Sequence, residues 1–79
     1  MQAFNDACRR LSEAVKKARR RVGLSQEALA LEAGINRSFV GQIERGVANP
    51  SLQVLTKLAT ALEVDVGDLL KRERENRRR

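Results

Sequence analysis

In the stretch NRSFVGQIERG, residues 36–46, the first seven residues hold four side chains that can donate directed hydrogen bonds. They belong to Asn36, Arg37, Ser38 and Gln42. Arginine presents a planar fork of donors, and glutamine presents a donor beside an acceptor, so both suit paired hydrogen bonds to a rigid polar surface. The chain has no histidine, and no nucleophile stands beside a base of the kind that covalent catalysis uses. The pattern therefore indicates recognition and not catalysis.

Two apolar residues, Val40 and Ile43, are interleaved with these polar ones. At helical spacing both point to one side, and Arg37, Ser38 and Gln42 then share the opposite, exposed side. The stretch therefore predicts a short helix with an apolar underside and a polar outer face.

The ends of this helix and of the one before it follow from their capping residues. Asn36 precedes a predicted helix over residues 37–45, which Gly46 closes, and Ser25 precedes another helix, which Gly34 stops. Serine and asparagine accept hydrogen bonds from the first free N–H groups of a helix, and glycine adopts the left-handed conformation at its end. Two helices joined by a tight turn are expected.

Three further helices are predicted around them. A first helix, with an undefined start, ends at Gly23 and carries an apolar stripe of Phe4, Cys8, Leu11, Val15, Ala18 and Val22. A fourth, capped by Ser51, carries a stripe of Leu52, Leu55, Leu58, Ala59 and Leu62. A short fifth is capped by Asp65 and runs through Leu70. Because no alternating strand pattern is present, the expected fold is all-α, with five short helices around one core.

Apolar spacing strengthens the expectation for the central pair of helices. Counted from Gln26, small or apolar residues occupy positions 4, 5, 8, 10, 15 and 18, and glycine occupies position 9. These residues are Leu29, Ala30, Ala33, Gly34, Ile35, Val40 and Ile43. A small residue at the crossing and a glycine in the turn let two helices meet at a steep angle. That arrangement leaves the outer face of the second helix projecting, ready for the major groove of DNA.

Net charge, cysteine content and hydropathy narrow the possible classes of protein further. The net charge is +6 and the sequence pI is about 10.7, which favours an anionic partner. The basic excess lies in residues 1–22 and 71–79, whereas the middle is acidic overall. A single cysteine, Cys8, excludes a disulfide framework and an ordinary zinc site. With no apolar run long enough for a membrane, we expect a soluble, cytoplasmic protein without cofactor or metal.

The stretch GLSQEALALEAGINRSFVGQIERGVANPSLQVLTKLATALEVDVGDLL resembles the XRE/Cro family of phage-repressor-type DNA-binding domains. The resemblance covers about residues 10–70. It implies a compact five-helix, lambda-repressor-like domain that binds a two-fold-symmetric operator as a homodimer. The length and the LEVDVGDLL ending are also similar to restriction–modification controller proteins, a feature that phage repressors and antitoxins share.

The resemblance also implies roles for individual residues. Arg37, Ser38 and Gln42 occupy the positions that face base edges, where arginine pairs with guanine and glutamine with adenine. Gln26 is placed against a phosphate and the edge of the recognition helix, while Asn36 and the backbone N–H groups around Asn49 are expected to contact phosphates. Arg45 is near enough to be a further phosphate candidate.

Two further groups are structural. Arg19 and Glu44 match a family ion pair that orients the recognition helix. Val64, Val66 and Leu69 form either a dimer interface or the last part of the core, since a chain of this size has difficulty burying all of them.

The expected organisation is a DNA-binding domain over residues 1–70, followed by a basic tail over residues 71–79 that is frayed or disordered. The expected function is a transcriptional regulator, repressor or activator, with operator DNA, a second copy of itself and RNA polymerase as partners. No enzymatic activity, membrane or small-molecule ligand is expected. The alternative is a protein-interaction module such as an antitoxin or coactivator adaptor; RNA binding is more distant, because stacking aromatics are missing.

Overall fold

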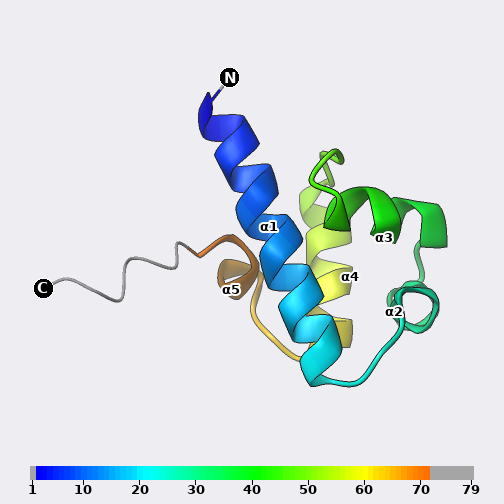
Figure 1. Ribbon diagram of the computed structural model, residues 1–79. Helices are drawn as coiled ribbons and strands as arrows, with labels where there is room; N and C mark the ends of the chain where they lie inside the picture. Colours follow the sequence, from blue (N-terminus) through cyan, green and yellow to red (C-terminus); the bar gives the residue numbers. More distant parts are fainter. Residues whose placement is uncertain (1, 72–79) are drawn as a thin grey trace, which may run out of the picture.

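The computed structural model describes residues 2–71, and this range contains five helices and no strand (Figure 1). The helices are α1 (Gln2–Arg21), α2 (Gln26–Ala33), α3 (Arg37–Glu44), α4 (Leu52–Leu62) and α5 (Val66–Leu70). The all-α prediction with five helices is confirmed. Most of the predicted basic tail, residues 72–79, lies outside the described residues.

Capping side chains begin three of the helices. The Oγ atoms of Ser25 and Ser51 accept hydrogen bonds from Ala28 N and Val54 N, at 3.0 and 3.1 Å. Asn36 Oδ1 accepts from Ser38 N at 2.7 Å. Each bond satisfies a backbone donor that the first helical turn leaves without a partner.

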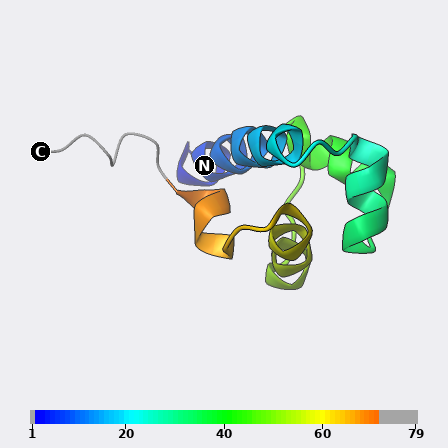
Figure 2. The ribbon, with the colours of Figure 1, turned by 90° about the horizontal axis from the view of Figure 1, so that it is seen from below.

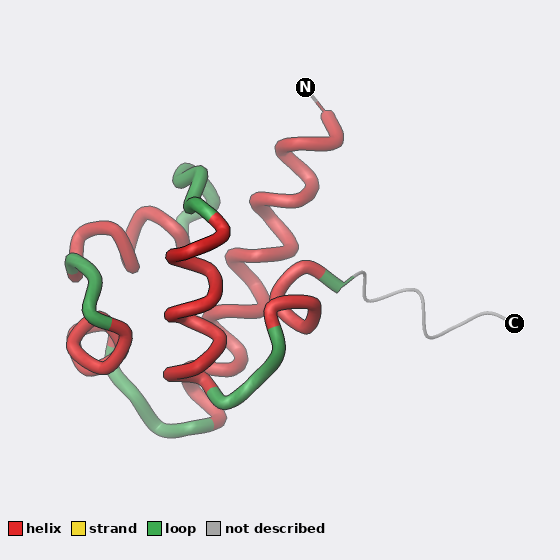
Figure 3. The backbone as a smooth tube through the Cα atoms, turned by 180° about the vertical axis from the view of Figure 1, so that it is seen from behind, coloured by secondary structure: helices red, strands yellow, loops and turns green. Residues whose placement is uncertain are grey.

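The five helices surround one core (Figures 2 and 3). Seen from behind, α4 occupies the centre, with α2 on one side and α5 on the other (Figure 3). α1 packs against α3, α5 and α4, while α3 packs against α1 and α2. Because only one side of α3 meets the rest of the chain, its other side faces outward.

Apolar side chains from every helix build this core. Those that are almost wholly buried are Val15, Leu29, Val40, Ile43, Leu58, Leu62 and Leu69. Cys8 is also buried, and its thiol lies 3.7 Å from Ala48 O. No helix within residues 2–71 is long and apolar enough to cross a membrane.

Three local expectations are corrected. Phe4 and Leu52 were assigned to core stripes, but they are 44% and 70% exposed. Both lie in the first turn of a helix, and the N-terminal end of α1 extends past the other helices (Figure 1). The third helix ends at Glu44, one residue earlier than expected, and Arg45 forms its C-cap.

Candidate nucleic-acid interface

The outer face of α3 carries the polar residues that the sequence placed there. Arg37, Ser38 and Gln42 are exposed, whereas Val40 and Ile43 are buried beneath them. These two apolar side chains fix the helix against the core and so determine which side chains face outward. The structure therefore brings the three predicted base-contacting residues onto one free surface.

The turn between α2 and α3 sets the position of that surface. Gly34 adopts a left-handed conformation with φ of +71°, and Ile35 N donates to Ala30 O at 3.0 Å. Ala30 and Ala33 are buried. Small side chains at these two positions leave room for α3 to pack closely on α2.

A buried carboxylate joins three helices at the end of α3. Arg19 of α1 donates from Nε to Glu44 Oε2 at 2.7 Å and from Nη2 to Glu44 Oε1 at 3.1 Å. Gln26, the first residue of α2, donates from Nε2 to Glu44 Oε1 at 3.0 Å. Only 6% of Glu44 is exposed. The paired bonds from one guanidinium make this a strong and directional contact.

The environment of Glu44 favours its ionised form. Burial is the largest influence and by itself raises the pKa of this carboxyl. Hydrogen bonds from Arg19 and Gln26, with the charges of Arg19 and Lys16, outweigh it and hold the pKa of Glu44 below its ordinary value. The hydrogen bond to Glu44 likewise raises the pKa of Arg19. Both groups are therefore charged at neutral pH.

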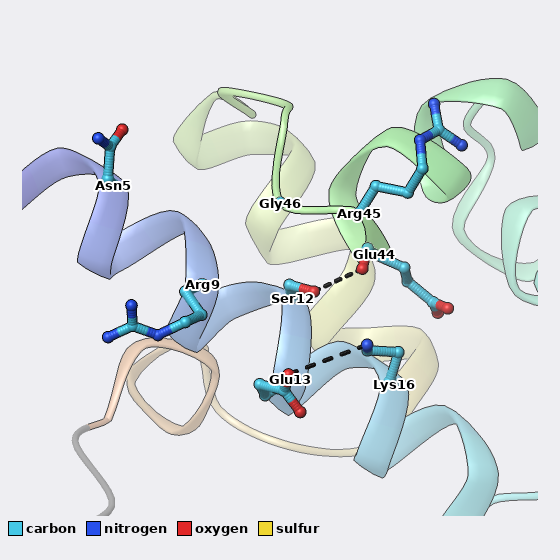
Figure 4. Close-up of a pocket in the computed structure, with 8 residues that line it drawn as sticks. All are labelled: Asn5, Arg9, Ser12, Glu13, Lys16, Glu44, Arg45 and Gly46. Carbon is cyan, nitrogen blue, oxygen red and sulfur yellow. Dashed lines mark hydrogen bonds and ion pairs between the residues drawn. The ribbon is translucent and has the colours of Figure 1, made fainter.

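α1 makes a second connection to the same end of α3. Ser12 Oγ donates a hydrogen bond to the backbone O of Glu44, and both residues are buried (Figure 4). The sequence did not identify Ser12, because a serine beside an apolar stripe carries no mark of its partner. Gln26 was expected at the edge of the recognition helix, but the sequence did not identify Glu44, 18 positions away, as its partner.

The predicted phosphate-contacting residues lie around α3, and they differ in how many of their hydrogen-bonding groups already have a partner within the chain. Asn36 uses its carbonyl oxygen for the cap, so its amide N–H groups are the ones that a phosphate can accept from. Gln26 directs its amide nitrogen at Glu44, which engages one of its two N–H groups. Arg45 and Asn49 are exposed.

A shallow depression lies between α1 and the C-terminal end of α3 (Figure 4). Arg9, Lys16 and Arg45 line it, together with Ser12 and Glu44. Arg9 forms an ion pair with Asp6 and Lys16 forms one with Glu13, at 3.2 and 3.9 Å. The charges of Arg9 and Lys16 in this depression are therefore balanced within α1, and Figure 4 shows the side chain of Arg45 directed away from these two residues.

The three residues assigned to a dimer interface differ in how deeply they are buried. Leu69 is 1% exposed and fills the core of its own chain, so its side chain has almost no surface to offer a second copy. Val64 and Val66 pack against that core and remain partly buried. Leu69 thus lies in the core of its own chain, where α5 packs against both α1 and α4, and a dimer interface at Val64 and Val66 stays a prediction.

Comparison with known proteins accords with this geometry. A family model described as helix-turn-helix matches residues 15–69. The chain belongs to this helix-turn-helix family. The match confirms the resemblance to the XRE/Cro family, and it includes both helices of the motif and the residues that support them.

Three relatives place the chain within the family. It is 40% identical over 70 residues to control protein C.SmaI of Serratia marcescens, covering 89% of this chain and 83% of that protein. The restriction–modification controller protein C.AhdI of Aeromonas hydrophila has a similar structure, with a TM-score of 0.75, 42% identity, and coverage of 78% and 94%. The complex of SinR and SinI proteins also matches, with a TM-score of 0.77, 35% identity, and coverage of 86% and 67%.

The relatives differ in length. The chain spans 34% of one curated relative, 60% of another and 83% of C.SmaI. These relatives are named as transcriptional regulators and control proteins.

Proposed function

We propose that this protein is a sequence-specific DNA-binding regulator of transcription. The observation that carries the proposal is the outer face of α3, where Arg37, Ser38 and Gln42 project from a helix whose other side is held by the buried Val40 and Ile43. Recognition helices of this motif enter the major groove and contact base edges with their N-terminal residues. Arg37 and Ser38 are the first two residues of α3.

Each side chain has a distinct role in this proposal. Arg37 pairs with O6 and N7 of a guanine, and Gln42 pairs with N6 and N7 of an adenine. Ser38 contributes a single hydrogen bond. Asn36, Asn49 and the second amide N–H of Gln26 contact phosphates, which sets the register of the helix on the duplex without reading sequence.

We assign the domain to residues 1–70 and its working form to a homodimer. A two-fold-symmetric pair presents one α3 to each half-site, with half-sites about 34–36 Å apart along the duplex. We place the interface at the corner between α4 and α5, where Val64 and Val66 lie, with Leu69 supporting it from the core. The operator is then two-fold symmetric as well.

Control of a restriction–modification operon is the favoured biological role. The support is the similarity to C.SmaI and C.AhdI, because this chain spans 83% and 94% of those proteins. Dimers on an operator act by occupancy, either blocking RNA polymerase or recruiting it, in the cytoplasm where the DNA lies.

Selection of preferred sites from random DNA tests the proposal, followed by binding measurements on the selected site at one fixed salt concentration. Replacing Arg37 or Gln42 with alanine is expected to cost about 1–3 kcal/mol of binding free energy and to relax preference at one base position. Equal weakening on every sequence would show that these residues do not read bases. A mass measurement of the complex gives the number of copies bound.

A protein partner is the second candidate, favoured by one observation. One of the similar structures is that of a complex between the SinR and SinI proteins. If this chain acts chiefly by binding a protein, its DNA affinity is weak and indifferent to sequence, and a pull-down with the tagged chain recovers a stoichiometric partner. A tight and selective DNA complex argues against that candidate.

A further inference from the structure

One position on the outer face of α3 has no side chain. Gly41 lies three residues after Ser38 and four before Arg45, so these three residues follow one line along the helix surface. Gln42 lies beside this line. Arg45 therefore belongs to the same outer face as the proposed base-contacting residues and not to the flank of the helix.

The guanidinium of Arg45 lies over the gap at Gly41. A Cβ atom built on Gly41 would be 3.4 Å from Nη1 of Arg45. Long side chains on a helix point back toward its N-terminus, and four residues correspond to about 6 Å along the axis. The charged end of Arg45 is consequently carried from the end of α3 back to its middle.

No acidic side chain within residues 2–71 forms an ion pair with this guanidinium. The ion pairs among residues 2–71 do not include Arg45, whereas Arg9, Lys16 and Arg19 each have an acidic partner. Figure 4 shows the side chains of Arg45 and Glu44 leaving the helix in different directions. Arg45 is exposed and its five N–H donors can serve an external acceptor.

We propose that Arg45 is a fourth base-reading residue, specific for a guanine in the half-site, and that Gly41 is the gap through which its guanidinium reaches that base. The inference rests on the proposed function. The sequence suggested a phosphate as the partner of Arg45; its place on the line through Ser38 and Gly41, beside Gln42, points to a base edge. An arginine fork matches O6 and N7 of guanine, and this pairing distinguishes guanine from the other bases.

Glycine at position 41 fits this role better than it fits the helix. Glycine is the least favourable residue inside a helix apart from proline. Alanine would place its Cβ at the limit of ordinary contact with Arg45, and any longer side chain would occupy the space that the guanidinium crosses. Position 41 therefore controls whether Arg45 lies along the outer face of α3.

The experiment uses the full chain and compares site selection and competition binding for wild type, Arg45→Ala, Arg45→Lys and Gly41→Val. We expect wild type to prefer guanine at one position that neither Arg37→Ala nor Gln42→Ala affects. Arg45→Ala and Gly41→Val should each reduce that one preference by at least about fivefold. Arg45→Lys should weaken it, because an ammonium cannot form the paired bond. Combining Gly41→Val with Arg45→Ala should cause no additional weakening, since both act on one contact.

Arg21→Ala is the matched control, because it removes the same charge from an exposed residue that lines the side of α1 next to α5. It should leave every base preference in place. Circular dichroism checks folding, which Gly41→Val should preserve because valine is a better helix former than glycine. If Gly41→Val nevertheless unfolds, the two Arg45 variants decide the question.

Two outcomes overturn the inference alone. In one, Arg45→Ala weakens binding equally on all sequences, as removal of a phosphate contact does. In the other, every preference of the wild type survives Arg45→Ala. If the wild type shows no sequence preference at all, the proposed function fails, and this inference fails with it.

Discussion

The side chain of Glu44 connects α1, α2 and α3 through a single carboxylate, so its contribution is both electrostatic and geometric. Arg19 and Gln26 supply three hydrogen bonds to its two oxygens. A buried carboxylate costs free energy unless such partners compensate it. Removing any one member therefore leaves a charged or polar group without one of its partners in a largely buried position.

We predict that Glu44→Ala lowers the free energy of unfolding by about 3–5 kcal/mol, because it leaves the Arg19 guanidinium without its partner. Gln26→Ala removes one hydrogen bond to a charged group and should cost about 1.5–3 kcal/mol. Urea denaturation measures both. Glu32→Ala is the control, since Glu32 is exposed on α2 and its replacement should change stability by no more than about 0.5 kcal/mol. A Glu44→Ala protein as stable as that control would refute the structural role.

The pH dependence of stability should carry the signature of the same residue. Because the pKa of Glu44 is lower in the folded chain than in the unfolded chain, its stabilisation is complete above the unfolded pKa and is lost as pH falls through the folded one. We expect the midpoint of thermal unfolding to fall as pH decreases from 6 to 3 (roughly the range in which carboxyls titrate).

Glu44→Gln should flatten this acid slope, and Glu32→Gln should not. Identical slopes in the two variants would show that other carboxyls account for the acid sensitivity. The raised pKa of Arg19 adds nothing in this window, since arginine stays protonated far above it.

At the scale of single elements, the features that could be predicted from the sequence are mostly those that depend on neighbouring residues. The caps at Ser25, Asn36 and Ser51 and the turn at Gly34 depend on neighbouring residues, and the structure shows each of them. Local patterns do not show how far other helices cover the first turn of a helix, so Phe4 and Leu52 were wrongly placed in the core. They also do not show which distant polar groups meet, as with Ser12 and the backbone of Glu44.

Among the candidate site residues, the same distinction holds. Helical periodicity alone predicted that Arg37, Ser38 and Gln42 share a face, because a period of 3.6 residues fixes it. Residue type does not identify every residue in the left-handed conformation, as the C-terminal end of α4 shows. Glu63 adopts φ of +63° there, although glycine is the usual residue in that conformation.

The turn between α2 and α3 gives a prediction for these elements. Gly34→Ala should lower the free energy of unfolding by about 1–2 kcal/mol, because φ of +71° is costly for a residue with a Cβ atom. Nothing lies within 4 Å of a Cβ at this position, so the cost is conformational and not a clash. Chemical denaturation gives the value.

Gly67→Ala is the matched control for that turn. Position 67 also has nothing within 4 Å of a new Cβ, but it lies inside α5 and has no positive φ. Alanine there should be neutral or stabilise the chain by up to about 1 kcal/mol. Equal effects at the two glycines would show that the left-handed turn does not limit stability. The Gly34 variant should also bind DNA less well, because the turn sets the projection of α3.

At the scale of the whole molecule, most of the positive charge lies outside the segment that is proposed to read the DNA sequence. Residues 36–46 contain two arginines and one glutamate, so the reading segment itself is only weakly basic. α1 carries seven basic residues and two acidic ones, and residues 72–79 carry five arginines and two glutamates. Attraction to the duplex is therefore expected to come from regions that do not choose the sequence.

The salt dependence of DNA binding distinguishes these two contributions. Replacing the five arginines of residues 72–79 with glutamine, at unchanged chain length, should make the dependence of log K on log salt shallower by about 0.9 for each phosphate that the tail no longer neutralises. Preferences at the base positions read by α3 should not change, since phosphate contacts carry no sequence information. Replacing Arg37 alone should do the reverse, relaxing one base position with a much smaller effect on the salt slope. An unchanged slope in the five-glutamine protein would mean that these arginines make no phosphate contacts, and the attraction would then belong to α1.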